Sequence, residues 1–114
     1  MVEPGEIYWA DLDQAGRRPI IVISREELNR GAHVLAVVCT SSRLAMRSLL
    51  PNFVFFQAGQ FGFSKDCVAQ CEQLIYLDKT QLDPGGPFGQ LDDLTLRDVI
   101  KAIGYVMDSD CEPL

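Results

Sequence analysis

The chain has 114 residues, of which 47% are hydrophobic and 23% charged, so it can bury the core of one domain and is too apolar to be intrinsically disordered. No apolar run approaches the roughly 18 residues that a membrane-spanning helix needs. The formal net charge of −6 argues against generic nucleic-acid binding through long-range attraction to phosphates.

Three strands and one short helix are predicted in the first part of the chain. Residues 6–12 alternate with the period of two that a strand imposes, which places Ile7 and Trp9 on one face. Residues 19–23 and 34–39 are continuous apolar runs, typical of strands buried on both faces.

Between these two apolar runs, residues 24–31 are predicted to form a short helical turn, with Ser24 as its N-cap and Gly31 as its stop. Residues 43–48 show no clear period, and we expect a mobile loop there.

The second half of the chain predicts two more strands and a helix. The strands are expected at residues 53–57 and 67–77, with a glycine-rich turn between them. Residues 82–89 hold two prolines and three glycines, which indicates a linker within the domain. From Thr95, the expected N-cap, apolar residues follow helical spacing to Met107.

Closely spaced strands followed by one late helix favour a single domain over residues 1–114. The predicted fold is mainly β, a small and strongly bent sheet or barrel capped by a C-terminal amphipathic helix. The acidic start of the chain does not resemble a secretory signal, so a soluble cytoplasmic protein is expected.

The four cysteines are expected to be reduced and mostly buried, because Cys39 lies inside an apolar run. Cys67 and Cys71 are separated by three residues, and His33 is the only histidine. This spacing does not suit a tetrahedral zinc site, so no metal and no other cofactor is predicted.

The charges are unevenly distributed along the chain. Residues 17–65 hold seven arginines and lysines against two glutamates, a net charge of +5, whereas both flanking segments are acidic. This pattern fits a basic groove on an acidic body, or a solvated surface on which charges cluster by chance.

Polar residues at the expected strand ends are the candidates for chemistry. Arg18 precedes one buried strand, Thr40 and Ser41 end another, and Gln70 and Glu72 share a face of a third. A guanidinium, a hydroxyl and a carboxylate that converge can bind a phosphodiester. The structural alternative is that Arg18 pairs with Glu72 at the rim while Thr40 satisfies backbone groups.

Seven segments in order along nearly the whole chain resemble the MazF/PemK toxin family. These segments are residues 4–13, 16–24, 29–30, 37–42, 71–73, 77–79 and 89–91. The resemblance implies an SH3-like β-barrel with a C-terminal helix, a homodimer, and a metal-independent endoribonuclease that cuts single-stranded RNA at short sequences. It also implies a MazE/PemI-like antitoxin as partner, and contact with operator DNA only through the antitoxin complex.

The resemblance also implies roles for individual residues. The ribose 2′-OH would attack the adjacent phosphorus. Arg18 would stabilise the developing charge or donate a proton to the leaving 5′ oxygen, Thr40 would hold a phosphate oxygen, and Glu72 would accept the 2′-OH proton. Further RNA-binding residues would be Arg17, Ser41, Ser42, Arg43, Arg47, Gln70 and Gln73.

The chain departs from the family pattern in two places. Gln70 stands where some relatives place an arginine two residues before the acid. The loop at residues 13–17 is short, so the preferred RNA sequence cannot be transferred from relatives.

Two other functions remain open at this point. Toxins that share this barrel poison DNA gyrase and cut nothing themselves, and a degenerate member would only bind antitoxin and DNA as a corepressor. Arg18, Thr40 and the +5 segment favour the nuclease over a gyrase poison, as does the absence of an apolar tail in residues 110–114.

Overall fold

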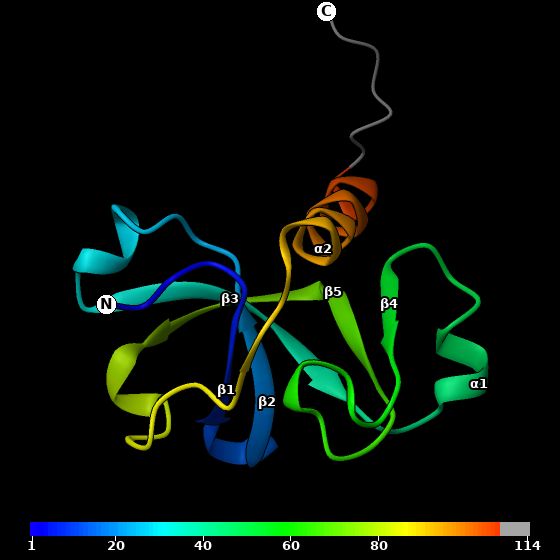
Figure 1. The fold of residues 1–114 in the computed structure, drawn as a ribbon, viewed down its shortest axis with the longest axis horizontal. Helices are drawn as coiled ribbons and strands as arrows, with labels where there is room; N and C mark the ends of the chain where they lie inside the picture. Colours follow the sequence, from blue (N-terminus) through cyan, green and yellow to red (C-terminus); the bar gives the residue numbers. More distant parts are fainter. Residues whose placement is uncertain (108–114) are drawn as a thin grey trace, which may run out of the picture.

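The computed structural model describes residues 1–107, which form one antiparallel sheet in the spatial order β4-β5-β3-β2-β1-β6 (Figure 1). The strands are β1 Glu6–Asp11, β2 Arg17–Val22, β3 His33–Thr40, β4 Phe53–Phe56, β5 Cys67–Asp78 and β6 Gly89–Gln90. The helices are α1 Leu44–Arg47 and α2 Asp93–Val106, with short 3₁₀ turns η1 Asp13–Ala15, η2 Leu28–Arg30, η3 Gln60–Gly62 and η4 Lys79–Gln81. The sheet curls into a half-barrel, and α2 covers one side of it, which confirms the predicted fold class.

Alternation along the strands divides the core between the two faces of the sheet. Ile7 and Ile21 belong to one buried cluster, whereas their neighbours Tyr8 and Ile20 belong to another. All three residues Ile20, Ile21 and Val22 are fully buried, so β2 is covered on both faces as predicted.

Helix α2 closes the first cluster by burying Val99 and Ala102 against β5 and β4. The N-cap is Asp92, three residues before the predicted Thr95, and its carboxylate caps the helix by accepting a hydrogen bond from the Thr95 amide at 2.7 Å. The prediction of Thr95 as N-cap was therefore wrong.

Three further local predictions need correction. The expected loop at residues 43–48 contains the single helical turn α1, since its Leu-Ala-Met-Arg residues are good helix formers and the Arg47 amide donates to the Arg43 carbonyl. The predicted turn after β2 exists as η2, but Ser24 does not cap it and instead bonds to Asn29 and to the Leu35 backbone.

The expected linker at residues 82–89 pairs with strand β1 at both of its ends and so is part of the sheet. Leu82 forms an isolated bridge with Ala10, and Gly89 pairs with Ile7 as the start of β6. Backbone hydrogen bonds to β1 therefore hold this proline- and glycine-rich segment at both ends.

A bulge interrupts the pairing of β3 with β5. Val37 lies opposite Leu74, but the next residue, Val38, lies opposite Gln70. Residues 71–73 are therefore extra on the β5 side, which changes the faces on which the polar residues of β5 lie.

Cys39, Cys67 and Cys71 are free and buried, as predicted, and burial raises the pKa of the Cys71 thiol to about 12. Cys111 lies outside the described residues. Within residues 1–107, no helix is both long and apolar enough to cross a membrane.

Edge strand β4 and the outer side of α2 expose apolar side chains that a second copy of the chain can cover. These side chains are Phe55, Leu94, Ile100, Val106 and Met107. We expect sedimentation at micromolar concentration to give about twice the 12.7 kDa protomer mass, as for a two-fold dimer. Ile100→Asp should shift the equilibrium toward the protomer, and a wild-type sample containing only protomers would contradict this prediction.

Candidate functional site

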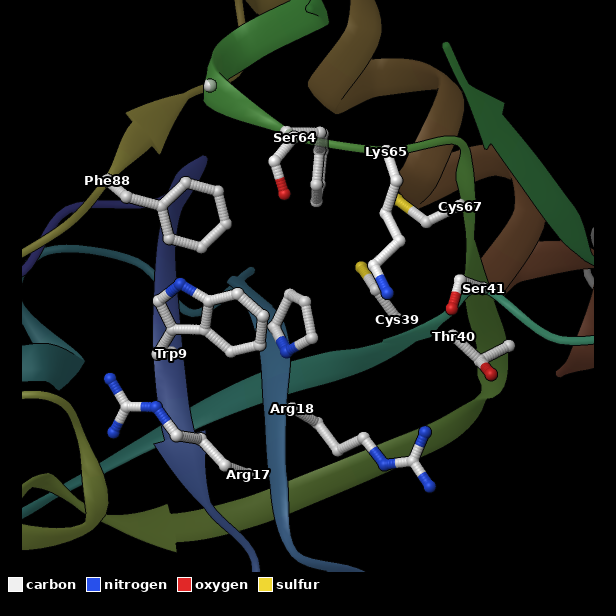
Figure 2. Close-up of a pocket in the computed structure, with 13 residues that line it drawn as sticks. Trp9, Arg17, Arg18, Cys39, Thr40, Ser41, Ser64, Lys65, Cys67 and Phe88 are labelled. Atoms are coloured by element: carbon white, nitrogen blue, oxygen red, sulfur yellow. The ribbon is translucent and has the colours of Figure 1, made fainter. Parts of the chain in front are cut away.

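A cavity of about 330 Å³ opens where the start of β2 meets the end of β3 (Figure 2). Strand β1, the loop before β5 and the residue before β6 complete its walls. Its lining residues are Trp9, Arg17, Arg18, Pro19, Cys39, Thr40, Ser41, Gly62, Phe63, Ser64, Lys65, Cys67 and Phe88. We call this cavity the main cleft.

Arg18 and Thr40 both line the main cleft, as the sequence predicted for the ends of two buried strands. The Nε of Arg18 donates to the Ala15 carbonyl at 3.1 Å, which fixes the root of the guanidinium while the side chain stays exposed. Figure 2 shows that the guanidinium extends toward the side of the cleft that holds Thr40. The two groups are therefore placed to contact one ligand.

A second, smaller cavity of about 220 Å³ shares Arg18 and Thr40 with the main cleft. We call it the side pocket. Its other polar lining residues are Ser42, Arg47, Gln70 and Gln73. The hydroxyls of Thr40 and Ser42 lie 3.1 Å apart, and Arg47 donates to the Ser42 hydroxyl at 3.1 Å. The structure thus joins most of the predicted site residues into one polar surface.

The side of the main cleft away from Thr40 and Ser41 is aromatic (Figure 2). The ring centroids of Trp9 and Phe88 are 5.7 Å apart, and Phe63 packs edge-on against Phe88 at the same distance. Arg17 lies over the Trp9 ring and forms an ion pair with Asp83 at 2.8 Å. That ion pair and its hydrogen bond hold the pKa of Asp83 below its usual value.

The lining of the two cavities carries positive charge only. Arg17, Arg18 and Lys65 line the main cleft and Arg47 lines the side pocket, whereas no carboxylate of residues 1–107 lines either one. A groove with cations, hydroxyls and an aromatic wall suits a ligand with phosphate and a flat ring. The basic groove predicted from the charge distribution is therefore present.

Glu72 lies apart from this groove. It is exposed, lines neither cavity, and accepts a hydrogen bond from the Asn52 amide group at 3.0 Å. The expectation that Gln70 and Glu72 face the same way was wrong, because the bulge in β5 places buried Gln70 with Gln73 in the side pocket. The alternative ion pair between Arg18 and Glu72 does not form either.

The remaining predicted residue, Arg43, also lines neither cavity, and its backbone is left-handed with φ of 53°. Among the lining residues of the main cleft that the sequence did not predict are the side chains of Trp9, Phe63, Ser64, Lys65 and Phe88. Only the count of cations in residues 17–65 pointed to Lys65, and no local pattern set the aromatic residues apart from core residues.

Comparisons with known proteins agree over nearly the whole chain. Residues 3–107 match the family described as PemK-like, MazF-like toxin of type II toxin-antitoxin system. The chain is 32% identical to endoribonuclease EndoA of Bacillus subtilis, with 72% of this chain and 75% of that protein covered. It is 30% identical to endoribonuclease MazF2 of Mycobacterium bovis, with 95% and 98% covered.

The fold has a close counterpart among solved structures. An endoribonuclease from a mycobacterial species, in complex with its cognate antitoxin, matches with a TM-score of 0.78 at 21% identity. The match covers 95% of this chain and 96% of that chain, so the two proteins share their whole fold.

Proposed function

Because this chain belongs to the PemK-like, MazF-like toxin family of type II toxin–antitoxin systems, we propose that it is an endoribonuclease that cuts single-stranded RNA in the main cleft. The observation that carries this proposal is that Arg18 and Thr40 line both cavities. The residues lining the two cavities include four cationic side chains and no carboxylate of residues 1–107. Single-stranded RNA offers what such a groove binds, namely phosphates and unstacked bases.

The proposed reaction needs no metal or other cofactor. The ribose 2′-OH attacks the adjacent phosphorus and gives its proton to water, while the bond from phosphorus to the 5′ oxygen of the next nucleotide breaks. The leaving oxygen takes up a proton from water, which gives a 2′,3′-cyclic phosphate and a 5′-OH end. Negative charge increases on the non-bridging oxygens as the phosphorane forms. The Arg18 guanidinium stabilises that charge, and the Thr40 hydroxyl donates to a phosphate oxygen.

The neighbouring residues are proposed to bind the rest of the RNA. Ser41 extends the hydroxyl wall of the main cleft, and Ser42, Arg47, Gln70 and Gln73 bind a neighbouring nucleotide in the side pocket. Arg17 and Arg43 contribute at the edges, and the aromatic wall of Trp9 and Phe88 stacks a base.

We further propose that an acidic, MazE/PemI-like antitoxin segment occupies the basic groove and competes with RNA there. Operator DNA would be contacted only through that complex. Since mRNA is the proposed substrate, we place the working homodimer in the cytoplasm.

A direct test is to incubate the purified protein with a long single-stranded RNA in excess chelator. Discrete fragments with 2′,3′-cyclic phosphate and 5′-OH ends support the proposal. Intact RNA, or cleavage that requires added metal, would overturn it, and intact RNA would favour a toxin of this fold that acts on a protein target such as DNA gyrase.

Glu72 provides a separate prediction. We expect Glu72→Gln to reduce single-turnover cleavage less than tenfold, because the carboxylate lies outside both cavities and bonds to Asn52. The loss of a general base typically costs about 10² to 10⁴-fold. A loss in that range, with unchanged RNA binding, would instead assign the base role to Glu72.

A further inference from the structure

The loop that precedes β5 is held rigidly over the main cleft. Gly62 has φ of +90°, and a Cβ built on it would lie 2.4 Å from the Phe88 carbonyl oxygen. A Cβ on Gly89 would lie 1.7 Å from the Phe61 carbonyl oxygen. These two glycines therefore let the loop and the segment entering β6 approach more closely than any other residues allow.

Hydrogen bonds fix the same loop at its base. The Gly59 amide donates to the Phe63 carbonyl at 2.8 Å, and the Asp66 carboxylate accepts from the Ala58 amide at 2.7 Å. Phe63 is buried against Phe56, with ring centroids 5.0 Å apart. Lys65 therefore projects from a loop that is anchored by contacts on both sides of it, at Phe63 and at Asp66.

Lys65 is directed into the main cleft from the wall opposite Arg18. Figure 2 shows its side chain running from the loop into the cleft, and Lys65, Arg18, Thr40 and Ser41 line the same cavity. No carboxylate of residues 1–107 forms an ion pair with Lys65, and the adjacent Asp66 already bonds to Ala58. The Lys65 ammonium thus adds an uncompensated charge to the cleft.

We propose that Lys65 is a catalytic residue that contacts a non-bridging oxygen of the scissile phosphodiester, on the side away from Arg18. This inference rests on the proposed RNA cleavage and adds a residue to it. The phosphodiester carries one negative charge before attack and a second as the phosphorane forms, so cations on two walls stabilise it more than either one alone. Lys65 transfers no proton and acts through its charge.

The test compares Lys65→Gln and Lys65→Arg with wild type and with Lys101→Gln, which removes an exposed lysine of α2 outside both cavities. Single-turnover cleavage by Lys65→Gln should fall by roughly 10 to 100-fold, whereas Lys65→Arg should recover most of the rate. Lys101→Gln should stay within twofold of wild type.

Binding of an RNA with a 2′-deoxyribose at the cleavage site gives a readout that does not depend on cleavage. Loss of one phosphate contact should lower the slope of log Kd against log salt by about 0.7 in Lys65→Gln only. An unchanged slope together with cleavage within twofold of wild type would overturn the proposal, as would equal losses in Lys101→Gln. If wild type binds this RNA but does not cut normal RNA, the proposed function fails, while the slope still reports whether Lys65 contacts phosphate.

Discussion

Arg18→Ala is expected to reduce single-turnover RNA cleavage by at least about 100-fold, the usual cost of removing a group that stabilises transition-state charge. The side chain is exposed, and its one described hydrogen bond goes to the Ala15 carbonyl, so the free energy of unfolding should change by less than about 1 kcal/mol. Quench-flow or gel-based single-turnover rates together with thermal unfolding measure the two effects.

Arg18→Lys should also lose most of the activity. In Arg18 the Nε donates to the Ala15 carbonyl and leaves the two terminal nitrogens free for a phosphate. An ammonium keeps the charge, but its single nitrogen cannot make both contacts through a planar fork. The matched control is Arg30→Lys, because Arg30 is exposed on η2 and lines neither cavity. Cleavage by Arg18→Ala at the wild-type rate would contradict the proposed mechanism.

Gly89→Ala is expected to destabilise the fold by about 3 kcal/mol and to lower Tm by roughly 10 °C or more. The added methyl group would lie 1.7 Å from the Phe61 carbonyl oxygen, and backbone atoms cannot move aside as a flexible side chain can. Either β6 leaves β1 or the loop carrying Lys65 moves away from the cleft. The variant should therefore also cleave RNA more slowly at temperatures where it remains folded.

The control for this prediction is Gly31→Ala. Its added methyl group would meet only the Leu28 carbonyl oxygen at 3.8 Å, an ordinary van der Waals distance, so its stability should stay within about 1 kcal/mol of wild type. Thermal unfolding of all variants at one protein concentration makes the comparison, since a dimer's Tm depends on concentration. Equal Tm values for Gly89→Ala and wild type would show that the backbone relaxes at little cost.

Local sequence patterns were enough to predict most of the strands and to place Arg18 and Thr40 at strand ends. Continuous apolar runs mark β2 and β3 because a strand covered on both faces excludes polar residues along its whole length. The polar residues that border such runs must lie at the ends of the strands, which predicted Arg18 and Thr40 there, whereas their assignment to one site came from the resemblance to the MazF/PemK family.

The positions of the other site residues depend on contacts between segments that are far apart in the chain. Glu72 leaves the site because of a bulge that depends on how β3 and β5 pair, and no local pattern in β5 encodes that register. Lys65, Trp9 and Phe88 come together because Gly62 and Gly89 allow two backbone segments to touch. Such contacts join residues far apart in the chain. The two backbone segments approach each other only once the sheet has curled, so no local sequence pattern can predict them.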